Sequence, residues 1–177
     1  MAPSAIPFIL FFAIVQVTDF RRSILPTSGR YCAVGIRGGV VHQTFHDSLE
    51  EVEAVADGHN STGVDAYFAM ASYDDQGMRK LPNVQFLRAL FLDIDCGPKK
   101  DYIDQVDGAK ALSAFITATG LPAPTLVNSG GGLHVYWPLT RDVTVEEWKP
   151  MARSLKQLCS NQAFHADPSV TTDAAPT

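Results

Sequence analysis

Phe91-Leu92-Asp93-Ile94-Asp95 is the stretch of sequence around which the rest of the chain can be interpreted. It closes a largely apolar run that begins at Phe86, and such a run predicts a buried β-strand. Side chains alternate along a strand, so Asp93 and Asp95 are expected on one face, with their carboxylates about 6–7 Å apart.

Two neighbouring carboxylates at the end of an apolar strand need a compensating partner, because they repel each other and lose hydration. A divalent cation between them would offset both costs, and hard cations such as Mg²⁺ prefer carboxylate oxygen. The alternative is a pair of solvated acids before the turn Cys96-Gly97-Pro98. The DxD pattern by itself leaves both interpretations open.

Length and composition indicate one domain with a full core. The chain has 177 residues, of which 46% are hydrophobic. Its net charge of −5 argues against a broad nucleic-acid-binding surface, although an acidic cluster remains compatible with bound cations. The three cysteines are far apart and show no CxxC spacing, which indicates neither a zinc site nor a disulfide framework and favours a reducing cytoplasm.

The apolar segment at the start of the chain, residues 1–17, stays unassigned. Its run from Ala5 to Val17 is shorter than the roughly 20 residues of a membrane span. A signal peptide would carry Lys or Arg before the run, and none is present. We favour a packed helix or strand over a secretory signal, with a wrongly chosen start codon as another alternative. We expect no membrane association, and we assign residues 18–177 to the main domain.

Strand and helix patterns alternate along this domain, which predicts an α+β or α/β class. Helix starts are indicated by Thr18-Asp19, Asp47 with Glu50, Asp107, and Thr144 with Glu147, and a helix end by Gly120. Strands are expected at 30–36, 40–45, 64–73, 122–127 and 133–137, with Gly38-Gly39 as a hairpin turn, Pro138 as a strand break and 165–173 as a strand-like tail.

A second feature is Ser129-Gly130-Gly131-Gly132-Leu133-His134-Val135-Tyr136-Trp137. Three glycines let the backbone approach a ligand closely, and their free N–H groups could form an anion nest. His134 and Tyr136 are expected on the same strand face, where the histidine could hold a phosphate. The alternative is a hairpin turn followed by a histidine that is simply hydrogen-bonded.

A third feature is Ala166-Asp167, followed by Pro168. Asp167 would supply a third carboxylate to a site for two ions, and Asp173 competes for this role. The alternative for each is a turn or cap aspartate, which is the commoner role of Asp before Pro.

In this order the three motifs resemble the archaeo-eukaryotic primase superfamily, and most closely its phage and plasmid primase-polymerases. The family's order is an hhhDhD strand, a small-x-His strand and a hydrophobic-Asp strand, which correspond here to 91–95, 132–134 and 166–167. The resemblance covers about residues 18 to 175. It implies an RRM-like primase-polymerase catalytic core preceded by an N-terminal αβ unit.

The function that this resemblance implies is template-directed nucleotidyl transfer from NTP or dNTP by a DNA primase/polymerase in phage or plasmid replication. Mg²⁺ or Mn²⁺ would be held by Asp93, Asp95 and Asp167, with Asp173 as the alternative third ligand. The incoming nucleotide would be bound by His134, Ser129, Gly130, Gly131, Gly132 and Tyr136. The implied partners are a single-stranded DNA template and a replicative helicase domain of the full-length protein, in the cytoplasm of a bacterial or phage-infected cell.

The chain departs from the family pattern in two places. The middle motif often has Ser where this chain has Gly132, so one hydroxyl contact is missing. The family pattern continues after Asp173 with arginines and a Pro-Gly turn, so the chain is expected to be truncated at its C-terminus, and the activity is expected of the intact protein rather than of this piece.

Two other functions remain as alternatives. A haloacid-dehalogenase-type phosphatase also begins with hhhDxD, but it would have Gly-Thr or Gly-Val after the second aspartate, where this chain has Cys96. A replication-initiator module would bind DNA without catalysis.

Overall fold

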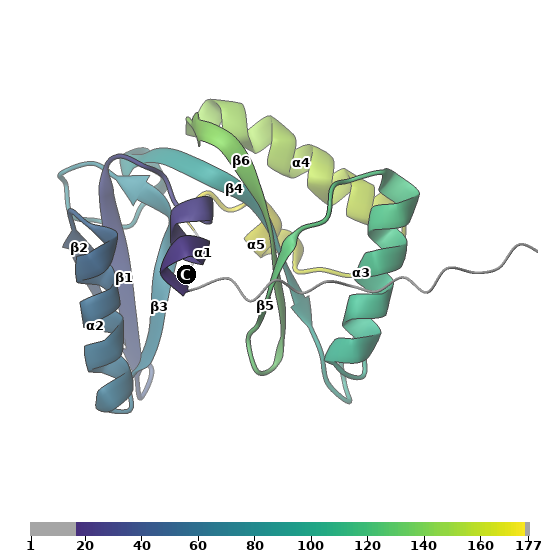
Figure 1. Ribbon diagram of the computed structural model, residues 1–177, viewed down its shortest axis with the longest axis horizontal. Helices are drawn as coiled ribbons and strands as arrows, with labels where there is room; N and C mark the ends of the chain where they lie inside the picture. Colours follow the sequence, from purple (N-terminus) through teal and green to yellow (C-terminus); the bar gives the residue numbers. More distant parts are fainter. Residues whose placement is uncertain (1–16, 176–177) are drawn as a thin grey trace, which may run out of the picture.

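The computed structural model describes residues 17–175, which form a six-stranded sheet flanked by five α-helices (Figure 1). The strand order is β2-β1-β3-β4-β6-β5, and all neighbouring strands are antiparallel. The strands are β1 (Arg30–Arg37), β2 (Val40–His46), β3 (Asp65–Tyr73), β4 (Val84–Asp95), β5 (Thr125–Asn128) and β6 (Gly132–Val143). The helices are α1 (Val17–Ile24), α2 (Leu49–Ser61), α3 (Gln105–Thr119), α4 (Val145–Asn161) and α5 (Pro168–Thr172). The predicted α+β class is confirmed.

The central strand β4 changes its neighbours along its length. It pairs with β3 only over its first residues, 84–87, and with β6 from Leu87 to Asp95. One edge of its second half is therefore free of a neighbouring strand, and its carbonyl groups need other donors. The Trp148 indole N–H donates to the Ala89 carbonyl oxygen at 2.8 Å. The Asp167 backbone N–H donates to the Asp93 carbonyl oxygen at 2.9 Å. The sheet thus opens between β3 and β4, and Asp93 lies at this opening.

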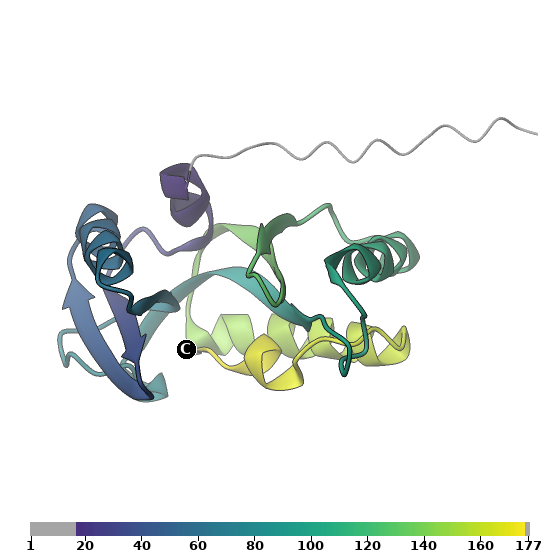
Figure 2. The same ribbon diagram turned by 90° about the horizontal axis from the view of Figure 1, so that it is seen from below.

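The helices cover both sides of the sheet. Figure 2 shows α1 and α2 on one side and α4 and α5 on the other. Buried side chains of α3 and α4, including Leu112 and Leu155, form one core cluster with Leu92 and Ile94 of β4. The face of β4 that carries Leu92 and Ile94 therefore packs against α3 and α4, which are distant from it in sequence. This packing holds the strand that carries Asp93 and Asp95 in place.

The predicted helix starts are partly correct. The capping box of Thr144 and Glu147 is confirmed. The cap of α3 is Asp104, whose carboxylate accepts the Asp107 N–H at 2.8 Å, so the prediction of Asp107 was wrong by three residues.

An error of one residue occurs at α2. Its N-cap is Ser48, which accepts the Glu51 N–H, rather than Asp47 with Glu50. The cause is the same in both places: the cap must lie three residues before the amide it binds, and neighbouring polar residues offer competing registers.

Three further predictions were wrong. β6 continues through Pro138, which lies opposite Ala89 where the register shifts, and a bulge of this kind tolerates proline. The stretch 165–173 contains helix α5 rather than a strand. α1 already begins at Val17, so Thr18 and Asp19 lie inside it and do not precede it.

The predicted apolar segment lies mostly outside the described residues, so its division from the main domain stays a prediction. Among residues 17–175, no helix combines the length and apolar character needed to cross a membrane.

Candidate functional site

The pairing of β4 with β6 places Asp93 directly opposite His134. The His134 Nε2 atom lies 3.7 Å from Asp93 Oδ1, and the Tyr136 hydroxyl lies 3.4 Å from His134 Nδ1. The predicted shared face of His134 and Tyr136 is therefore confirmed. The imidazole stands between a carboxylate and a phenol, an arrangement that restricts the orientation of its ring.

Asp93 is the least hydrated acid of this group. Burial is the main cause that raises the pKa of Asp93, His134 opposes the shift, and the negative charges of Asp95 and Asp167 add to it. Asp95 and Asp167 therefore both lie close enough for their charges to act on Asp93. Keeping Asp93 ionised costs free energy that a nearby cation would offset.

Asp167 joins this group through its backbone and caps a helix with its side chain. Its N–H binds the Asp93 carbonyl, while its Oδ1 accepts the Ser169 hydroxyl at 2.6 Å and the Ser169 N–H at 2.8 Å. These bonds, with that of the Ser169 side chain first, lower the pKa of Asp167. The interpretation as a cap aspartate is confirmed, whereas the role as a cation ligand stays a prediction, for which Oδ2 is the candidate oxygen.

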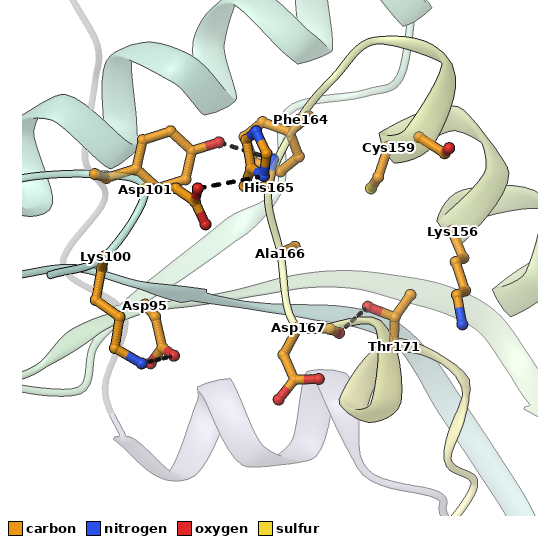
Figure 3. A pocket seen from close by; sticks show the side chains of 12 residues that line it. Asp95, Lys100, Asp101, Lys156, Cys159, Phe164, His165, Ala166, Asp167 and Thr171 are labelled. Carbon is orange, nitrogen blue, oxygen red and sulfur yellow. Dashed lines mark hydrogen bonds and ion pairs between the residues drawn. The ribbon is translucent and has the colours of Figure 1, made fainter.

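Asp95 ends β4 and pairs with Lys100, which the sequence motifs do not include. Lys100 Nζ lies 2.6 Å from Asp95 Oδ2 (Figure 3). This hydrogen bond raises the pKa of Lys100, and the charges of Asp93 and Asp167 act in the same direction. The ammonium therefore lies where it interacts with all three carboxylates. The sequence signal that could have indicated this pair is a lysine five residues after Asp95, beyond the turn at Gly97-Pro98.

The donor set suits a hard divalent cation, since it consists of carboxylate oxygens. Even so, no group of three or more His, Cys, Asp or Glu side chains within 17–175 is arranged so that it could hold a metal ion. Asp95 is bonded to Lys100, and Asp167 Oδ1 is bonded to Ser169. A cation that binds Asp95 through Oδ2 has to displace Lys100, whereas one that binds through Oδ1 lies close to the positive charge of Lys100.

The glycine turn is a tight hairpin between β5 and β6, and part of its polar backbone is already used. The Ser129 N–H donates to the Gly132 carbonyl at 3.1 Å, and the Gly130 N–H donates to Asn128 Oδ1 at 2.8 Å. Gln105 of α3 fastens the turn through bonds to Asn128 and to the Gly130 carbonyl. The amides of Ser129 and Gly130 therefore serve the turn, and an anion nest built on them stays a prediction.

Gly132 has a structural role of its own at the start of β6. A Cβ atom at this position would collide with the carbonyl oxygen of Ile94 on β4. A serine would meet the same obstacle. The close approach of β6 to β4 beside Asp95 therefore requires glycine.

Asp173, the alternative third acid, lies past the end of α5. Its carboxylate accepts the Ala175 N–H at 2.9 Å, and its charge acts on Tyr73 rather than on Asp93. Of the two candidates for the third acid, Asp167 rather than Asp173 is bonded to β4 at Asp93.

Two cavities adjoin the carboxylates. One of about 310 Å³ lies at the opening between β3 and β4 and is lined by Phe20, Tyr67, Phe68, Asp93, Ser129, His134 and Tyr136, among others. The other, of about 630 Å³, is lined by Asp95, Lys100, Lys156, His165 and Asp167, among others (Figure 3). The first combines an aromatic wall with the pair of Asp93 and His134, and the second combines acids with lysines. The aromatic wall was also missed, because its members come from separate elements.

Comparisons with known proteins bear on the fold. No protein-family model matches the chain, and no curated protein matches it. Among solved structures, the chain is similar to the AEP domain of the primase-polymerase of cyanophage S-2L, with a TM-score of 0.55 and 19% identity, over 82% of this chain and 68% of that one. The chain has a fold of the archaeo-eukaryotic primase type. At this identity the likeness concerns the fold, and the RRM-like description of its core stays a prediction.

Proposed function

We propose that this chain is a primase-polymerase catalytic domain that transfers nucleotides from NTP or dNTP to a strand growing on a single-stranded DNA template. The observation that carries the proposal is the pair of Asp93 and His134 at the opening of an AEP-like sheet, with Asp167 bonded to the backbone of Asp93. Sequence motifs that are far apart in the chain thereby meet at one place.

In this proposal each side chain has a distinct role. Asp93, Asp95 and Asp167 Oδ2 would hold Mg²⁺ or Mn²⁺, which would neutralise phosphate charge and activate the attacking hydroxyl. His134 donates from Nε2 to the triphosphate, and the Tyr136 hydroxyl at Nδ1 positions the ring.

The reaction follows from this placement. The strand's hydroxyl attacks the α-phosphorus in line, and pyrophosphate leaves. The chain contributes positioning and electrostatic stabilisation rather than a covalent intermediate.

The smaller cavity suits the nucleotide that this reaction needs. Its polar end carries Asp93 and His134, and its walls carry aromatic side chains from α1 and β3, including Tyr67, which is 46% exposed. Aromatic walls favour nucleobases without selecting one base. The proposal includes phage or plasmid replication, a cytoplasmic setting and a helicase domain in the full-length protein, all of which rest on the motif resemblance.

Template-directed incorporation with Mg²⁺ or Mn²⁺ tests the function. We expect Asp93→Ala to reduce incorporation by about 100-fold or more, because the loss removes electrostatic stabilisation that is specific to the transition state. Asp57→Ala is the matched control, since Asp57 is an exposed acid on α2. Equal incorporation by wild type and Asp93→Ala would refute the proposal.

The same proteins distinguish the alternative functions. DNA binding that persists in Asp93→Ala, with no incorporation by the wild type, would indicate an initiator module. A phosphate group attached covalently to Asp93 would indicate a phosphatase.

A further inference from the structure

Lys100 is held in place by a short loop that folds back onto the end of β4. The Gly97 N–H donates to the Tyr102 carbonyl at 2.8 Å, and the Lys100 N–H donates to the Gly97 carbonyl at 3.0 Å. Cys96 also forms a bridge to Tyr102 in the manner of neighbouring strands. The loop backbone is therefore fixed, and it directs the Lys100 side chain toward Asp95 (Figure 3).

The ammonium of Lys100 interacts with the carboxylates that we assign to the cation. It is bonded to Asp95 Oδ2 at 2.6 Å, and its charge acts on Asp93 and Asp167 as well. One positive charge thus already partly offsets the repulsion among three negative charges. A divalent ion that binds Asp95 Oδ2 has to displace the ammonium, and one that binds the other oxygens is repelled by its charge.

We propose that Lys100 is a tethered cation that competes with the divalent ion for Asp95 and so lowers the metal affinity of the protein in the absence of nucleotide. This inference rests on the proposed function. Its ligand class is the divalent metal ion, and the competitor is part of the chain itself.

The strength of the competition follows from exposure. The side chains of Lys100 and Asp95 are 51% and 58% exposed, so water screens their attraction. Because exposed ion pairs are weak, we expect Lys100 to change the dissociation constant of the metal ion by at most about fivefold. The lysine therefore adjusts metal affinity and does not block the site.

Binding of Mn²⁺ alone, measured from the paramagnetic resonance signal of the free ion, tests the proposal on the whole chain. We expect Lys100→Gln to lower the dissociation constant about two- to fivefold relative to Lys99→Gln. The two variants lose the same charge at adjacent positions, so Lys99→Gln controls for long-range electrostatics. Lys100→Arg retains a cation and should bind Mn²⁺ no more tightly than wild type.

A second measurement needs no substitution. Acylation of lysines, followed residue by residue by mass spectrometry, should be faster at Lys100 when Mn²⁺ is present and unchanged at Lys99. Equal Mn²⁺ affinity of Lys100→Gln and Lys99→Gln, or acylation of Lys100 that is insensitive to Mn²⁺, overturns the role of Lys100 while leaving the proposed function intact. Absence of Mn²⁺ binding in every variant overturns both.

Discussion

At the scale of single residues, the proposed cation site requires Asp93 to keep its charge in a half-buried position. Its side chain is 31% exposed, and the His134 ring beside it is 37% exposed. A neutral asparagine would remove the desolvation cost and the repulsion from Asp95 and Asp167. Residues of this kind usually lower stability and are kept for function, which makes the Asp93 substitution above the most direct test of the site.

Gly132 lies opposite Asp95 and allows β6 to approach β4 closely at the candidate site. We expect Gly132→Ala to lower the free energy of unfolding by about 1–3 kcal/mol, because the new methyl group forces β6 away from the Ile94 carbonyl. Gly131→Ala is the control: a Cβ atom there meets nothing within 4 Å, so its cost should stay within about 0.5 kcal/mol. Urea denaturation measures both, and equal costs would contradict the assigned close approach.

At the scale of elements, α4 supplies a hydrogen-bond donor to the edge of β4 that has no neighbouring strand. Trp148 is fully buried, donates its indole N–H to the Ala89 carbonyl and stacks on Phe91 with ring centroids 5.5 Å apart. The helix begins with the capping box of Thr144, which sets the position of Trp148 one turn later. A local capping signal thereby determines which carbonyl of β4 receives a donor.

Trp148→Phe tests this role. We expect a loss of stability of about 1–3 kcal/mol, because the Ala89 carbonyl loses its donor where water cannot replace it. Trp137→Phe is a useful comparison, since it removes a bond of the same length, 2.8 Å, to the less buried Pro122 carbonyl. Thermal unfolding of both variants checks the prediction, which fails if Trp148→Phe costs no more than Trp137→Phe.

At the scale of the whole molecule, Asp142 of β6 joins three distant parts of the chain. Its carboxylate accepts the Thr27 N–H and hydroxyl at 2.8 and 2.7 Å and binds Arg88 of β4 at 2.9 Å. Burial acts to raise the pKa of Asp142, but the bonds from Thr27 and Arg88 outweigh it and hold that pKa below its usual range. The segment after α1 is thereby fixed to the central strands.

The depressed pKa has a consequence for acid stability. Because the folded protein binds this proton less readily than the unfolded chain, the stabilisation is complete above the ordinary Asp pKa of about 3.9 and is lost as the pH falls through the lower, folded value. We expect Asp142→Asn to cost about 1–2 kcal/mol at neutral pH and progressively less in acid. Denaturation of wild type and variant across this pH range measures the difference, and a cost independent of pH would refute the linkage.

Much of the fold could be predicted from local patterns in the sequence. The hairpin of β1 and β2 at Gly38-Gly39, the β4 strand ending in Asp93 and Asp95, and the capping box of Thr144 all depend on residues at most a few positions apart. Side-chain alternation and helix capping act over such distances, so these features can be recognised without a tertiary structure. Where neighbouring residues offered two registers, as at Asp104 and Asp107, the local pattern was ambiguous.

The sequence alone determined the types of residue at the site and their order: two acids on a strand end, a histidine after a glycine turn, and a late aspartate. Only the tertiary structure decided that β3 leaves β4 after Leu87, that Asp167 binds the freed edge, and that Lys100 turns back onto Asp95. The opening between β3 and β4 and the capture of Asp167 depend on the packing of segments far apart in the chain, and the pairing of Lys100 depends on how a non-repetitive turn folds. Neither follows from periodicity, because the free energy that selects such contacts comes from the assembled core and its unpaired strand edge.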